Sequence, residues 1–281
     1  MYKLFKSTKT AYYISLVASF IIFLSELFLL PRPLCFIVIV VTYIILVIIL
    51  FIILVYANKK YNKTLEVFSS DPIEFIKEQE SFLQVPNLSK KVTALIKTNI
   101  GSAYINLDRY SEAKEFCSSL EPYVTKKSNV INRFVLMTNL TVINAHLKDR
   151  ISTEKYRTMA KNALNYIKNS KVFSAPEMVN KYEIIFRTSC ASADFFLEKN
   201  HQTADELLKC IDPYYDIKQE VSGYKDEVSY HYIKGYALTV LGEHDKAREH
   251  FEYITKSDTK LPCAERVRNY LRTGDQSCLD A

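Results

Sequence analysis

The chain has 281 residues, a net charge of +6, only 5 glycines and no tryptophan. Scarce Gly alongside frequent Leu, Ile, Lys, Glu and Tyr disfavours a β-rich domain, which needs many turns, and predicts an all-α chain. Residues 1–57 carry four basic side chains and one acidic, whereas the rest of the chain carries 33 basic and 30 acidic. Because this second part is nearly balanced, nothing in the sequence indicates a nucleic-acid-binding surface.

Two apolar runs open the chain. Residues 11–30 form a run of 20, the length that crosses about 30 Å of hydrocarbon as a helix. Residues 34–57 contain no charged side chain, and Pro31 and Pro33 break the helix between the runs. We therefore expect a two-helix transmembrane hairpin, with residues 1–63 as the anchor and its linker. A cleavable signal peptide is the alternative for the first run, but the run is too long and a second span follows it at once.

The charges beside these runs predict the orientation of the hairpin. Three lysines precede the first run, three follow the second, and only Arg32 lies between them. The six lysines are Lys3, Lys6, Lys9, Lys59, Lys60 and Lys63. Since basic residues stay on the cytoplasmic side, we expect a multi-pass protein of the cell membrane whose N- and C-termini are both cytoplasmic. Glu26, inside the first run, is a functional site by default, for a proton or a partner; the alternative is that it snorkels or pairs with Arg32.

The second domain, residues 64–281, is predicted to be a helical array. Its clearest unit is Asn99–Tyr123, where apolar side chains at helical spacing predict two short amphipathic helices joined by a tight turn. Small residues at Gly101 and Ala113 would let the two helix backbones approach closely. Ala113, Ala160, Ala204 and Ala247 are interpreted as the same position in four second helices, at separations of 47, 44 and 43. About four helical hairpins are therefore expected.

This unit resembles the tetratricopeptide (TPR) repeat, in which a Gly is followed by an aromatic residue three positions on and by an Ala in the second helix. Gly101, Tyr104 and Ala113 carry that likeness here. A spacing of 43 to 47 departs from the roughly 34 residues typical of the family, so a longer helical-hairpin variant is the alternative. The resemblance implies an α-solenoid whose first helices form a concave, partner-binding face.

No catalytic or metal-binding motif is visible in the sequence. There is no phosphate-binding loop, nucleophile elbow or HExxH helix, and the 5 histidines are dispersed. The 6 cysteines form no CxxC pair, which disfavours a zinc site or a disulfide framework. We therefore expect no cofactor, no metal and no enzymatic activity.

By the geometry of the TPR resemblance, seven residues are expected to face the groove: Thr98, Ser102, Asn106, Asn144, Tyr232, Tyr236 and Thr239. Their polar groups would bond a peptide backbone, and the tyrosines would add contact area. The expected function is a membrane-anchored scaffold that holds a peptide or protein partner at the cytoplasmic membrane surface. Two alternatives remain: an assembly or regulatory subunit that acts through its transmembrane hairpin, and an enzyme whose site no motif reveals.

Overall fold

The computed structural model describes residues 70–84, 88, 90–124, 130–170, 176–222 and 227–280, with scattered positions between 41 and 68. All elements of these ranges are helices, which confirms the predicted all-α class. The α-helices are α3 (Pro72–Leu83), α4 (Lys90–Asn106), α5 (Tyr110–Ser118), α6 (Val130–His146), α7 (Arg150–Asn169), α8 (Pro176–Glu198), α9 (His201–Ser222), α10 (Glu227–Val240), α11 (His244–Lys256) and α12 (Pro262–Thr273). Two 3-10 helices are η1 (Glu121–Tyr123) and η3 (Gln276–Leu279).

The predicted membrane hairpin lies largely outside the described residues. The first span, 11–30, with Glu26 and Arg32, is entirely outside them, and the second, 34–57, is described only at scattered positions. Within the described residues, no helix combines the length and hydropathy that a membrane crossing needs. The described positions from 41 to 56 are helical, and their large apolar side chains are exposed, from Ile49 at 43% to Phe51 at 66%.

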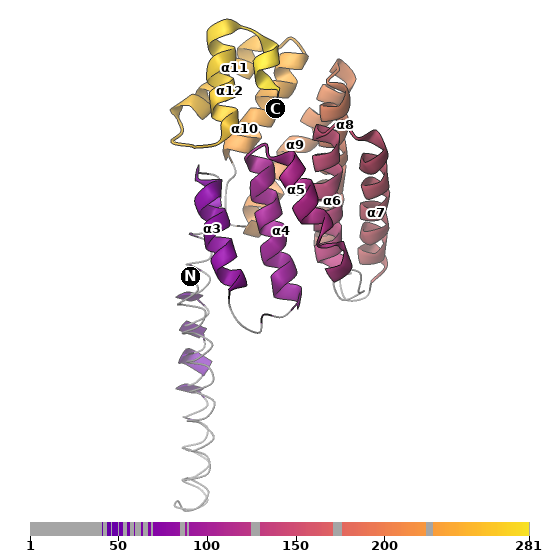
Figure 1. Ribbon diagram of the computed structural model, residues 1–281, viewed down its shortest axis with the longest axis vertical. Coiled ribbons are helices and arrows are strands. Elements are labelled where there is room, and N and C mark those ends of the chain that lie inside the picture. Colours follow the sequence, from indigo (N-terminus) through magenta and orange to yellow (C-terminus); the bar gives the residue numbers. More distant parts are fainter. Residues whose placement is uncertain are drawn as a thin grey trace, which may run out of the picture.

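Four helical hairpins follow one another in the described ranges: α4–α5, α6–α7, α8–α9 and α10–α11 (Figure 1). Each hairpin turns at one residue in the left-handed region. These residues are Asp108 (φ 57°), Lys148 (φ 58°), Lys199 (φ 47°) and Gly242 (φ 78°). A left-handed residue after a helix reverses the chain while its neighbours satisfy the last helical carbonyls. The four turns therefore mark one recurring structural unit.

The turns correct the predicted register of the second unit. After each turn, the first residue of the second helix with 0% exposure donates its backbone N–H to the carbonyl of the residue four positions earlier; these residues are Ala113, Thr153, Ala204 and Ala247. All four have 0% exposure. The equivalent of Ala113 is thus Thr153 and not Ala160. Ala160 lies two helical turns further along the same buried face, which is why it matched the pattern.

Two glycines allow close approach of the helices within their hairpins. A Cβ built on Gly101 would lie 2.4 Å from the Cys117 sulfur, and one on Gly235 would lie 2.6 Å from the Phe251 ring. No side chain fits at these distances. The predicted close approach at Gly101 is thus present, and Gly235 serves the same purpose in the fourth hairpin.

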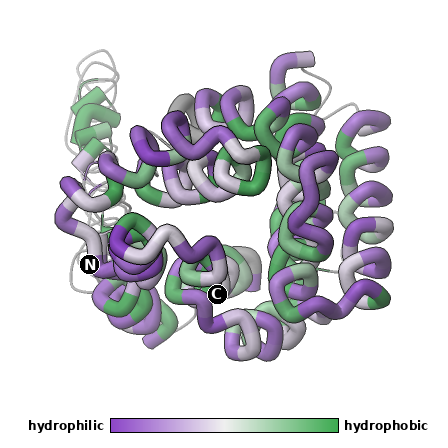
Figure 2. Tube along the Cα trace, turned by 90° about the horizontal axis from the view of Figure 1, so that it is seen from above, coloured by the Kyte–Doolittle hydropathy of each residue, from purple (hydrophilic) through white to green (hydrophobic). Residues whose placement is uncertain are grey.

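The array curves until its two ends meet. Lys260, just before α12, donates its backbone N–H to Ser70 O at 3.0 Å, and its Nζ lies 2.5 Å from Asp71, the N-cap of α3. Arg266 of α12 is ion-paired with Asp108 in the first hairpin turn. Seen from above, the helices are arranged around a common centre (Figure 2). The described domain is therefore closed into a ring rather than left open as an extended solenoid.

Candidate functional site

The centre of the ring holds a cavity of about 450 Å³. The first helix of every hairpin contributes a stripe of side chains at helical spacing. On α4 and α6 the stripes include Ser102, Asn106, Asn139 and His146. The ends of the array close the cavity with Phe75 of α3, Arg266 of α12 and Leu279 of η3, among others. A cavity of this size and mixed lining is suited to a peptide segment or a small ligand.

Four of the seven residues predicted to face the groove line this cavity: Ser102, Asn106, Tyr232 and Tyr236. Asn139 Nδ2 donates to Ser102 Oγ at 3.1 Å. The buried Nδ2 of Asn106 has no hydrogen-bond partner among the described residues. A buried amide donor without a partner is costly unless a ligand or water bonds it. Asn106 is therefore a polar contact that a bound ligand can complete.

The other three predicted groove residues are buried in helix packing. Each bonds the carbonyl one turn back on its own helix: Thr98 to Ala94 O at 2.8 Å, Asn144 to Leu140 O at 2.7 Å and Thr239 to Gly235 O at 2.9 Å. At exposures of 5%, 0% and 2%, they offer no surface to a partner in this conformation. This local bonding satisfies the two threonine hydroxyls and the Nδ2 of Asn144, whereas the buried Oδ1 of Asn144 has no hydrogen-bond partner among the described residues.

An aromatic stack with a histidine at its middle forms one wall of the cavity. The His146 ring lies between Tyr110 and Phe196, with centroid distances of 4.0 Å and 3.8 Å. Burial, together with the charges of Lys199, Arg266 and Lys148, lowers the pKa of His146 to about 3. The imidazole is therefore neutral at pH 7 and acts as a flat, uncharged contact surface.

Charged side chains gather at the hairpin turns on one side of the cavity. Asp108, Lys148 and Lys199, the left-handed residues of the first three turns, all line it. Burial and then the charge of Lys199 lower the pKa of Lys148, so the two ammonium groups repel each other. Sequence reasoning missed these residues, although aligning the turns of the four units would have found them.

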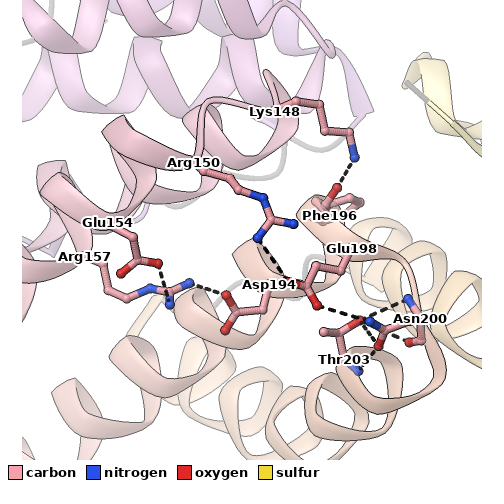
Figure 3. A network of polar contacts seen from close by, with 9 residues as sticks. All are labelled: Lys148, Arg150, Glu154, Arg157, Asp194, Phe196, Glu198, Asn200 and Thr203. Atoms are coloured by element: carbon pink, nitrogen blue, oxygen red, sulfur yellow. Dashed lines mark hydrogen bonds and ion pairs between the residues drawn. The ribbon is translucent and has the colours of Figure 1, made fainter.

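Figure 3 shows how the Lys148 turn is held against the neighbouring hairpin. Lys148 Nζ donates to Phe196 O at the end of α8. Arg150 pairs with Glu198 at 3.3 Å, and Arg157 pairs with Asp194. These contacts join α7 to α8, so the position of Lys148 depends on the packing of the second hairpin on the third.

The C-terminal segment is seated against the cavity. Tyr232 Oη donates to Leu279 O at 2.5 Å, and Arg266 Nε donates to Tyr232 Oη at 3.0 Å. The Tyr236 hydroxyl and the Lys199 ammonium both donate to the carboxylate of Asp280. Tyr232 and Tyr236 are thus bonded by the chain itself, a contact that sequence reasoning missed.

Two histidines that the sequence suggested were dispersed meet on the hairpin α10–α11. His231 Nδ1 and His250 Nδ1 are 2.7 Å apart, and His231 stacks on Tyr253 at 4.0 Å. Burial, followed by the charge of His231, lowers the pKa of His250 to about 4. Neither histidine lines the cavity.

The cavity lining offers several kinds of polar and aromatic contact. Hydroxyls, amides, two lysines and an aromatic wall converge, which suits hydrogen bonding and carboxylate recognition. Among the residues that the structure describes, no three His, Cys, Asp or Glu side chains come together as metal ligands would. Comparison of the chain with protein-family models, with curated proteins and with solved structures found no match.

Proposed function

We propose that this protein is a membrane-anchored binding protein that holds a peptide or protein partner at the cytoplasmic surface of the cell membrane. The central cavity carries the proposal, because all four first helices direct polar and aromatic side chains into it. Such convergence from separate units is how helical-repeat proteins recognise extended ligands. The role is one of adaptor or scaffold and not of catalysis.

The N-terminal segment supports the membrane part of the proposal. Residues 11–30 and 34–57 are long enough to span a bilayer. The large apolar side chains described between 41 and 56 are exposed. Lipid is the environment in which such a helix is stable. With both termini cytoplasmic, the cavity lies close to the inner face of the membrane.

The test is site-specific photo-crosslinking of the full chain in intact membranes. A photoreactive amino acid replaces Asn106, inside the cavity, or Lys161, an exposed position on α7. We expect defined protein adducts from position 106 that are missing from position 161. The same adducts at both positions, or none at position 106, would contradict binding in the cavity.

A further inference from the structure

After α12 the chain turns back into its own ring. After α12 the left-handed Gly274 (φ 72°) reverses the chain, and Asp275 accepts the N–H of Ser277 at 2.9 Å to start η3. Leu279 is then fully buried, at 0% exposure. Its contacts are long-range, since its carbonyl accepts from Tyr232, which is 47 residues away in the sequence. The η3 segment is thus docked against α10 by a buried side chain and a hydrogen bond.

The docked segment makes both an apolar contact and hydrogen bonds through a carboxylate. Leu279 joins the apolar cluster that includes Tyr236, Ala264 and Val267. The Asp280 carboxylate accepts from Tyr236 and from Lys199, which is 81 residues away in the sequence. An apolar anchor next to a carboxylate bonded by an ammonium and a phenol is the pattern of a recognised peptide motif.

The cavity is complementary to that motif in charge. Lys148 and Lys199 line the same side of it, and the charge of Lys199 makes protonation of Lys148 less favourable, while that of Asp280 favours it. A carboxylate between them relieves this repulsion. The pair of lysines therefore selects for an acidic group, whether the chain or a partner supplies it.

We propose that the tail, residues 275–280, presents Leu279 and Asp280 as a tethered ligand that occupies part of the partner-binding cavity, and that the partner presents the same chemistry, a leucine followed by an acidic residue. The inference rests on the proposed function, because it assigns the cavity to a partner peptide. Binding of the partner requires displacement of the tail. The tail then holds the protein in a closed state until a competing acidic segment is abundant enough.

Tethering sets the size of the expected effect. A segment joined to its site by a short linker competes at an effective concentration of about 1 mM. For a peptide whose intrinsic dissociation constant lies between about 10 and 100 μM, this competition weakens apparent binding roughly 10- to 100-fold. Removing the tail should therefore increase the apparent affinity by that factor. Weakening one of the tail's contacts should give a smaller increase.

The experiment measures binding of a fluorescent probe peptide to the full chain in detergent by anisotropy. The probe has the sequence of residues 275–281 with Cys278→Ser, to prevent oxidation. We expect weak binding to the wild-type chain and roughly 10- to 100-fold tighter binding to a chain that ends at Asp275. A probe with Asn in place of the acidic residue after leucine should lose most of this binding, and Lys199→Ala in the shortened chain should do the same.

A matched pair of full-length variants keeps the test valid should the shortened chain unfold. Asp280→Asn and Gln276→Lys each raise the net charge by one, but Gln276 is exposed and lies outside the cavity. We expect Asp280→Asn to tighten probe binding about 3-fold or more, with Gln276→Lys near wild type. The proposal is overturned if a folded shortened chain binds the probe no better than wild type, or if the two variants behave alike.

The probe assay and the crosslinking test can fail separately. Tight probe binding to the shortened chain without adducts at position 106 would support the tail as a competing ligand and would contradict the adaptor function. Adducts at position 106 without a difference between Asp280→Asn and Gln276→Lys would support the adaptor and reject the tethered tail.

Discussion

Three hairpin turns each contain a residue that shapes the backbone and also places a charge at the cavity: Asp108, Lys148 and Lys199. Each closes a hairpin turn in the left-handed conformation, at φ values between 47° and 58°. Asp tolerates this conformation better than Lys does, so the two lysines carry a small strain. In the fourth turn the same position is Gly242, which has no side chain to contribute. The charged residues thus occur in three of the four turns, where they line the cavity.

The contact between Gly101 and Cys117 gives a first prediction. Gly101→Ala places a methyl group 2.4 Å from the Cys117 sulfur, and overpacking of this kind costs about 1–3 kcal/mol. We expect the free energy of unfolding to fall by that amount, as measured by urea titration with circular dichroism. Adding Cys117→Ala removes the sulfur and should recover much of the loss. Equal destabilisation with and without Cys117→Ala would show that the clash is not at this sulfur.

The buried histidines predict a dependence of stability on pH. The pKa of His146 is about 3 in the folded chain against 6.5 when unperturbed, so the unfolded chain binds more protons between these values. Stability therefore falls as pH is lowered through this window, by up to about 1.4 kcal/mol per pH unit for each such histidine. His250, with a pKa of about 4, acts in the same direction.

The matched variant is His146→Phe, which keeps a ring between Tyr110 and Phe196 but cannot titrate. Urea titrations at pH 7 and pH 5 should show that the variant loses up to about 2 kcal/mol less than the wild type over this range. An identical pH dependence in the two proteins would mean that His146 is protonated in the folded state.

At the scale of the elements, the ring depends on a polar seam between α12 and the first helices. Lys260 contacts Ser70 and Asp71, and Arg266 contacts Asp108 across 158 residues of sequence. The apolar clusters, in contrast, are formed within runs of neighbouring helices. Closure of the ring is therefore determined by a few charged side chains, whereas neighbouring hairpins are held together by the apolar clusters that they share.

Arg266 and Asp108 form the most buried ion pair of this seam, with side chains 15% and 18% exposed. Arg266→Met leaves the aspartate without its partner, and we expect a loss of about 2–4 kcal/mol in the free energy of unfolding. Adding Asp108→Asn should reduce that loss, because the unpaired charge is removed. Arg248→Met is the control: Arg248 is 70% exposed in its pair with Glu252 and should change stability by less than about 1 kcal/mol. Similar losses for Arg266→Met and Arg248→Met would contradict the role of the seam.

For the whole molecule, the proposed membrane anchor would set what the cavity can reach. The first hairpin follows directly after the apolar N-terminal segment and α3. A partner in the cavity would thus be held within the length of this short connection from the lipid. This geometry favours partners that are themselves at or in the membrane.

A topology experiment checks this arrangement. In intact cells we expect residues 64–281 to be protected from added protease and to be cleaved only after lysis, because the flanking lysines keep both ends inside. Deletion of residues 1–57 should move the protein from the membrane pellet to the soluble fraction. Cleavage of the domain from outside intact cells would reverse the predicted orientation, and so would place the cavity outside the cell.

Features that depend on local spacing were determined by the sequence itself. Leu136, Leu140 and Ile143 are an example, because they are all buried and such side chains repeat every three to four residues along a helix. Gly101 indicated a close crossing for a reason equally local, since only Gly leaves room for the next backbone. The all-α class and the helical hairpins follow from such patterns.

Only the tertiary structure decided which residues meet across the ring. Tyr232 and Tyr236 were expected to face a partner, and they do line the cavity, but they are bonded to Leu279 and Asp280, 47 and 44 residues further along the chain. Thr98, Asn144 and Thr239 are buried in the packing of α4, α6 and α10. Helical spacing predicts which residues share a face of a helix, but it does not predict which element covers that face. Closure of the ring and docking of the tail depend on contacts between residues 44 to 190 positions apart in the sequence. The spacing of residues within a single helix carries no information about such contacts.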